Sequence, residues 1–105
     1  MATGKLGAED LAATTNTVLY SAPASTLATL NLSICNRGAV NVKVRIAILD
    51  GAIGTLTDAD YIEYDLNLAA QGVVERTGIV VSNLASVMIY SDTANVSAVC
   101  WGFEE

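Results

Sequence analysis

Residues 40–49 read Val-Asn-Val-Lys-Val-Arg-Ile-Ala-Ile-Leu, and this stretch decides the fold class. Its even-numbered positions up to Ile48 are all valine or isoleucine, and polar residues or alanine stand between them. Side chains two positions apart in an extended chain lie on the same face, so this period of two predicts a β-strand with one buried face. At about 3.4 Å per residue, such a strand runs the full height of a small β-sandwich.

The preceding segment, residues 29–35, alternates in the same way, with leucine or isoleucine at every second position. The link between the two segments is Asn36-Arg37-Gly38, and a final glycine favours a three-residue hairpin loop. We therefore expect the two segments to be neighbouring antiparallel strands whose apolar residues share one face. The expected pairs are Ile34 with Val40, Leu32 with Val42, and Leu30 with Val44.

Five further short strands are expected between turn signals. They cover residues 17–20, 61–68, 73–81, 85–90 and 96–103. Within 61–68 the alternation predicts that Ile62, Tyr64, Leu66 and Leu68 face the core.

Together these strands predict an all-β fold, because no segment shows a sustained helical period. We expect residues 17–105 to form a single domain, an antiparallel β-sandwich of jelly-roll or immunoglobulin-like type with about seven to eight short strands. A single small barrel is the alternative. Residues 1–16 are rich in Ala, Thr and Gly without a clear period, and we expect an N-terminal arm or irregular lead-in there.

The last expected strand is apolar on both faces. Val99, Trp101 and Phe103 share one face, and Ala98 and Cys100 lie on the other. If the bulky set faces outward, it is a candidate subunit interface, because Trp and Phe are enriched at interface cores. The alternative is that the bulky set fills the core and Cys100 faces outward.

Composition points to a surface that is partly covered by protein. The chain has 105 residues, enough for one core, and hydrophobic residues make up 52% of it. Charged residues make up 15%, against about 25% in an ordinary soluble domain. Because large exposed apolar patches mark interaction sites, we expect burial against copies of this chain or another protein.

Charge argues against nucleic-acid and anionic-membrane partners. The net charge is −6 and only five residues are basic, whereas phosphate-binding surfaces need many Lys and Arg. No apolar run approaches roughly 20 residues, so we expect no transmembrane helix. The first ten residues lack an apolar signal region, which favours an unprocessed cytoplasmic product. In that compartment the two cysteines, Cys35 and Cys100, are expected to be free thiols.

An enzymatic function is not expected, because the chain has no histidine. The usual general base and metal ligand is therefore absent, and a Ser-His-Asp triad is excluded within one chain. We expect no catalytic residues, cofactor or metal.

Two groups of residues offer other binding chemistry. The acidic group could be read as a calcium site or a pair of hydrolytic carboxylates, but its spacing does not match an EF-hand, and we expect a solvated face. The group consists of Asp50, Asp58, Asp60, Glu63 and Asp65. The aromatic residues could line a sugar-binding face, although residues spread over four strands are more often core and interface. They are Tyr20, Tyr61, Tyr64, Tyr90 and Trp101.

Several short stretches from about residue 17 to the end also resemble a known family. They are Val18-Leu-Tyr20 with Pro23, Leu32-Ser-Ile-Cys-Asn-Arg-Gly38, Val44-Arg-Ile-Ala47, Tyr61-Ile-Glu-Tyr-Asp65, Val74-Glu-Arg-Thr-Gly78, Tyr90 with Ala94-Asn-Val-Ser97, and Gly102-Phe-Glu-Glu105. In these stretches the chain is similar to small virion structural proteins of tailed bacteriophages, including those of cyanobacterial phages. None of the stretches is a catalytic motif, and Cys100 and Trp101 are atypical of the group.

The resemblance implies a role and a place. It implies a non-enzymatic virion component, made in the host bacterial cytoplasm and present in many copies. A capsid decoration or cement protein is favoured, and a tail- or fibre-associated subunit is the alternative. The expected partners are further copies of the chain, as a trimer or other small ring, and other virion proteins such as the major capsid or tail proteins. A host-surface carbohydrate-binding module and a calcium-dependent adhesion domain remain as hypotheses from other classes.

Overall fold

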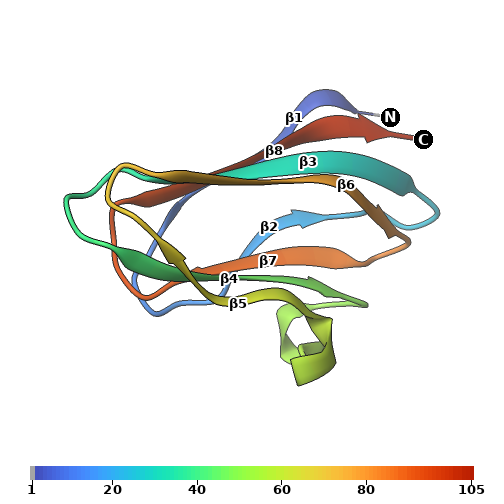
Figure 1. The fold of residues 1–105 in the computed structure, drawn as a ribbon. Coiled ribbons are helices and arrows are strands. Elements are labelled where there is room, and N and C mark those ends of the chain that lie inside the picture. The colour runs from blue at the N-terminus through green and yellow to red at the C-terminus, as the bar shows by residue number, and fades with distance from the viewer. Residues whose placement is uncertain (1) are drawn as a thin grey trace.

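The strands of the computed structural model, which describes residues 2–105, lie in two facing layers (Figure 1). Sheet A has the order β1-β8-β3-β6 and sheet B the order β2-β7-β4-β5, with antiparallel pairing throughout. The strands are β1 (Thr3–Leu11), β2 (Thr17–Ser21), β3 (Leu27–Asn36), β4 (Val42–Leu49), β5 (Tyr61–Leu68), β6 (Val73–Ser82), β7 (Ser86–Ser91) and β8 (Val96–Glu104). The predicted all-β sandwich is confirmed, and two four-stranded sheets in this order form a jelly roll rather than a seven-stranded immunoglobulin sandwich.

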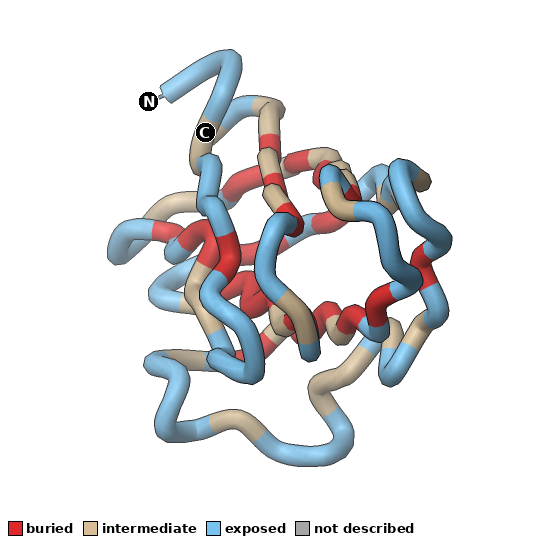
Figure 2. The backbone as a smooth tube through the Cα atoms, turned by 90° about the vertical axis from the view of Figure 1, so that its left-hand side faces the viewer, coloured by how far each residue is buried: buried red, intermediate tan, exposed pale blue. Residues whose placement is uncertain are grey.

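The core lies between the two sheets and consists of the alternating residues that the sequence marks. Leu32 and Ile34 of β3 and Val44 and Ile46 of β4 have no solvent exposure. Figure 2 shows buried and exposed positions alternating along the strands, with the buried ones toward the interior. The period of two identified the core-facing side chains correctly over residues 29–35 and 42–46. Beyond Ile46 it did not, because Ala47, predicted on the outer face, is also buried.

The predicted hairpin between these two segments is wrong. β3 pairs with β6 and β8, and β4 pairs with β5 and β7, so the two strands lie in opposite sheets. Their apolar faces meet across the core instead of side by side. Val40, which the hairpin would have paired with Ile34, is 58% exposed in the link that crosses between the sheets.

Asn36, the last residue of β3, is a buried polar anchor for this crossover. Its side-chain Oδ1 accepts a hydrogen bond from Gly38 N at 3.0 Å. Its Nδ2 lies within hydrogen-bond distance of the carbonyl oxygens of Val40 (2.8 Å), Leu68 (3.2 Å) and Ala69 (3.1 Å). One amide thus joins the end of sheet A, the crossover and the end of β5 in sheet B.

The predicted arm or irregular lead-in over residues 1–16 is wrong for residues 3–11, because these residues form strand β1. This strand pairs with β8 along its length and forms an edge of sheet A, while Met1 lies outside the described residues. A β-bulge between Lys5 and Gly7 shifts the register, so the alternation that would reveal the strand is interrupted.

A second bulge lies in β5, and it makes the predicted inward and outward faces of this strand partly wrong. Val44 pairs with Leu66 but Ile46 pairs with Glu63, so β5 has an extra residue between these pairs. Asp65 adopts a φ of +53° there, a conformation that Asp tolerates better than most residues. As a result Tyr64, predicted to face the core, is 58% exposed. Ile62, also predicted inward, is 44% exposed, whereas Leu68 is buried as predicted.

The two chain ends lie side by side (Figure 1) and share one carboxylate. Glu104 Oε2 accepts a hydrogen bond from Tyr20 Oη at 2.5 Å, and its Oε1 accepts one from Ala2 N at 3.0 Å. These bonds, with that from Tyr20 the larger cause, hold the pKa of the Glu104 carboxyl below its usual value. Glu104, on β8, therefore links β2 in sheet B to the residue that precedes β1 in sheet A.

Replacing Asn36 with aspartate is expected to lower the free energy of unfolding by about 3 kcal/mol. The reason is that a carboxylate at this position would face three carbonyl oxygens in a buried site. Urea denaturation followed by circular dichroism measures the loss. Asn31→Asp is the matched control, because its Oδ1 accepts from Gly78 N on the outer face of sheet A and an aspartate keeps that acceptor. Equal stability of the two variants would contradict the anchoring role.

Glu104 is expected to make stability depend on acid pH. Because its folded pKa is lowered, its contribution is present above the ordinary glutamate pKa of about 4.3 and is lost as pH falls through the folded value. Between pH 7 and pH 3 the wild type should therefore lose more stability than Glu104→Gln. Urea midpoints at the two pH values test this, and Glu105→Gln, the same change one residue on, should behave like the wild type. Parallel losses in wild type and Glu104→Gln would refute the expectation.

Candidate functional site

The structure decides which face of β8 is buried. Ala98 and Cys100 have no solvent exposure, whereas Val99 and Trp101 are half-buried and Phe103 is 44% exposed. The bulky set therefore lies on the outer face of sheet A, as one of the two sequence-based alternatives expected. We call these three residues the β8 stripe.

The inward positions of β8 are small, and one of them has no room for a side chain at all. Gly102 has a φ of +156°, and a Cβ there would lie 2.1 Å from Thr29 O and 2.8 Å from Leu30 Cα. The inward positions of β8 before it are valine, alanine and cysteine, all smaller than Trp or Phe. The bulky residues of β8 are therefore the ones that face outward.

Small or polar side chains flank the β8 stripe on its two neighbouring strands. Cross-strand neighbours share a face; Phe103 lies between Thr3 and Thr29, Trp101 between Lys5 and Asn31, and Val99 between Ala8 and Ser33. On β6, Val73 and Val80 are each 56% exposed and extend the apolar surface toward the sheet edge. Lys5 and Glu75 stand near the two opposite sides of the stripe.

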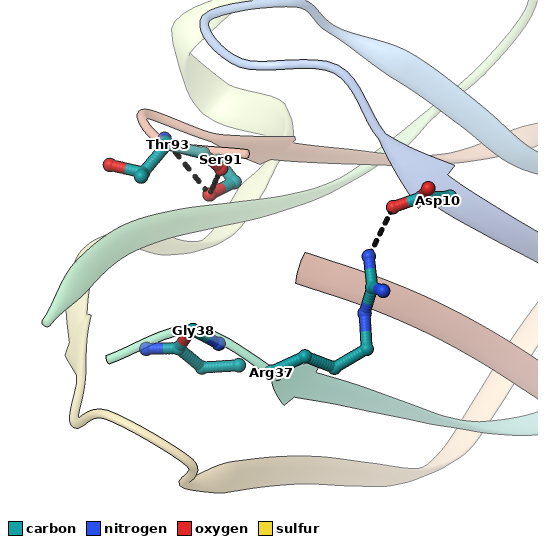
Figure 3. Close-up of polar contacts among 6 residues, drawn as sticks. Asp10, Arg37, Gly38, Ser91 and Thr93 are labelled. Carbon is teal, nitrogen blue, oxygen red and sulfur yellow. Dashed lines mark hydrogen bonds and ion pairs between the residues drawn. The ribbon is translucent and has the colours of Figure 1, made fainter. Parts of the chain in front are cut away.

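An ion pair between Arg37 and Asp10 lies at one end of this face. Arg37, just after β3, extends past β8 to reach Asp10 on β1 (Figure 3). The two side chains are 45% and 76% exposed, so the pair contributes little to stability. A shallow hollow beside the pair is lined in part by Ser97 and Val99, which makes it the charged end of the same face.

The residues of the predicted acidic group do not act together, because several of them bond to different partners. Asp65 accepts a hydrogen bond from Arg45 Nε at 2.6 Å, and Glu63 accepts one from Arg76 Nε at 2.6 Å. Asp60 accepts one from the backbone N–H of Thr57 at 2.9 Å. Within residues 2–105 no group of three or more Cys, Asp or Glu side chains is placed to hold a metal ion, so the calcium hypothesis finds no site there.

Both cysteines are free thiols, as predicted from the sequence. Cys100 is buried in the core, and burial raises the pKa of its thiol to about 11. A thiol in that state is neutral at physiological pH and is a poor nucleophile. In the same described part of the chain, no helix has the length and hydropathy needed to cross a bilayer.

Three of the five aromatic residues that the sequence offered as a sugar-binding face lie together on the opposite outer face. Tyr61 and Tyr64 of β5 gather there with Tyr90 of β7 and Arg45 of β4 on sheet B. The rings of Tyr61 and Tyr64 meet edge to face at 4.9 Å between centroids. The other predicted aromatics are elsewhere, because Tyr20 is buried and Trp101 lies on sheet A. Only the strand register, including the bulge in β5, brings the cluster together.

Comparison with protein-family models, with curated proteins and with solved structures gives no match. The two outer faces of the sandwich are therefore the observations from which a function can be argued.

Gly102→Ala is expected to destabilise the protein by about 3 kcal/mol or more, because the new Cβ would meet backbone atoms of β3 that cannot move aside. Thermal unfolding measures the effect. Gly54→Ala is the matched control, since a Cβ at Gly54 meets no atom within 4 Å. If both variants melt at the wild-type temperature, β8 does not approach β3 as described.

Proposed function

We propose that this chain is a non-enzymatic structural subunit of a tailed-phage virion, acting as a multi-copy capsid decoration or cement protein. The observation that carries the proposal is the outward β8 stripe, Val99, Trp101 and Phe103. A subunit of this kind works by burying part of its surface against neighbours, and the stripe offers a surface suited to that burial.

The composition of the face supports an interface. Interface cores are enriched in Trp and Phe and depleted in charged residues. On sheet A the stripe contains no charge, and Thr3, Thr29 and Ser33 flank it with small hydroxyl side chains.

The distribution of charge supports a position away from packaged nucleic acid. All three arginines are engaged by acids: Arg37 by Asp10, Arg45 by Asp65, and Arg76 by Glu63. The acids outside these pairs outnumber the two lysines, so the exposed excess is negative. Phosphate backbones would be repelled by such a surface.

A second copy of the chain is the partner that sheet A fits best. If two copies pack face to face about a two-fold axis parallel to the strands, β1 of one copy lies over β6 of the other. Lys5, on β1, then approaches Glu75 of the second copy, on β6. Lys5 of each copy would thus lie near Glu75 of the other, so the two-fold axis brings opposite charges together twice.

Other occupants fit the same face and remain outcomes of the test. A major capsid or tail protein could cover the stripe in place of a second copy, and a tail- or fibre-associated subunit would need the same features. The resemblance to virion structural proteins supports a place in the particle without choosing between capsid and tail. The measured mass of the assembly distinguishes a dimer from the trimer or small ring expected from the sequence.

Trp101→Glu is expected to weaken self-association by at least about 2 kcal/mol, because a carboxylate would be buried at the centre of the contact. Sedimentation velocity over a range of concentrations measures this. Tyr64→Glu, the same kind of change on the opposite face, is the control and should leave the sedimentation coefficient unchanged. Circular dichroism verifies that both variants fold.

The charge pair gives an independent check on the partner. Lys5→Glu alone should weaken association, and adding Glu75→Lys to it should restore association if the two residues meet between copies. A wild type that stays monomeric at every concentration would overturn self-assembly through this face.

A further inference from the structure

The outer face of sheet B carries a row of side chains that the assembly face does not use. Arg45 on β4 is the register partner of Tyr90 on β7, and Tyr64 on β5 lies at its other side. The guanidinium carbon of Arg45 is 4.2 Å from the ring centroid of Tyr64 and 4.5 Å from that of Tyr90. Arg45 Nε also donates to Asp65 Oδ1 at 2.6 Å.

These contacts hold an exposed ring in a fixed position. Tyr64 is 58% exposed, yet Arg45 stacks on it and the ring of Tyr61 meets it at an interplanar angle of 85°. The bulge at Asp65 sets this orientation, and the hydrogen bond from Arg45, which lowers the pKa of the Asp65 carboxyl, secures the bulge. A side chain that is already ordered loses little further entropy when a ligand binds.

The loop between β4 and β5 builds a wall beside this ring. Its short helices η1 (Ile53–Thr55) and η2 (Asp58–Asp60) lie outside sheet B (Figure 1). A capping box between Thr57 and Asp60 fixes η2. Leu56 and Tyr61 pack on a small buried cluster of Ala47, Leu49 and Met88.

The wall and the rings enclose a shallow hollow lined by Asp58, Tyr61 and Tyr64. Its lining combines aromatic surface with a carboxylate and phenol hydroxyl groups. A ligand that fits must therefore offer both an apolar face and several hydroxyl groups. Few common biological ligands other than sugars combine these two properties in one rigid ring.

We propose that this hollow is a binding site for neutral hexose oligosaccharides. The C–H face of a pyranose ring packs on the tyrosine rings, and Asp58 accepts hydrogen bonds from sugar hydroxyl groups. This inference goes beyond the structural role proposed above, and it stands on the opposite face of the molecule. Assembly through sheet A would leave the hollow open.

The charges around the hollow favour a neutral sugar over a cationic ligand and over an acidic sugar. Arg45 already occupies Tyr64 as a cation, so a second cation on that ring would be repelled by it. Acidic sugars would meet Asp58 and a net charge of −6. An uncharged hexose meets neither penalty.

The test is titration of the ¹⁵N-labelled full chain with neutral tetrasaccharides of glucose, mannose and galactose, followed by amide chemical shifts. At least one tetrasaccharide should shift residues 58–64 with a Kd on the order of 1 mM, and residues 97–103 on the opposite face should not move. Asp58→Asn should weaken that binding by about tenfold, and Tyr64→Ala by at least as much, while Tyr64→Phe should retain it.

Control titrations distinguish sugar binding in this hollow from binding of cations there and from binding on sheet A. Asp58 is exposed, so Asp58→Asn keeps the fold and the test does not rest on Tyr64→Ala alone. No shift with any tetrasaccharide, shifts only on sheet A, or shifts at 58–64 produced by choline but not by sugars would each overturn the proposal. Self-association is tested separately, by sedimentation of the wild type and Trp101→Glu. A negative result for sugar binding therefore leaves the proposed structural role unaffected, and the reverse also holds.

Discussion

The side-chain amide of Asn36 is the contact on which the rest of the structure depends. By joining Val40, Leu68 and Ala69 to the end of β3, it fixes the point where the chain leaves sheet A and enters sheet B. Because β3 and β4 are then in opposite sheets, their alternating apolar residues meet across the core. Each sheet is left with one outer face, and the two outer faces differ in chemistry.

Alternation in the sequence predicts which residues are buried but not which strands are neighbours. A hairpin and a crossover place Leu32 and Val44 in the core equally well, so the period of two cannot distinguish them. The burial of Asn36 and its bonds to Val40, Leu68 and Ala69 accompany the crossover, and the structure alone shows them. Bulges account for the other differences, since an extra residue hides β1 and turns Tyr64 outward.

The candidate surfaces were predictable to different degrees. The β8 stripe lies on a single strand, and the sequence left two possible orientations for it. The burial of Ala98 and Cys100 distinguishes them. The tyrosine cluster draws Arg45, Tyr64 and Tyr90 from three strands and depends on their register, which the sequence does not contain. The jelly roll thus separates an apolar outer face on sheet A from an aromatic and polar outer face on sheet B.

The most direct test of this account is the pattern of backbone nuclear Overhauser effects in the labelled protein. The account predicts cross-strand backbone contacts of Ser33 with both Val99 and Glu75, and only side-chain contacts between β3 and β4. A ladder of backbone contacts that joins Leu32 to Val42 would restore the hairpin. It would then contradict the crossover, the two sheets and the separation of the two outer faces.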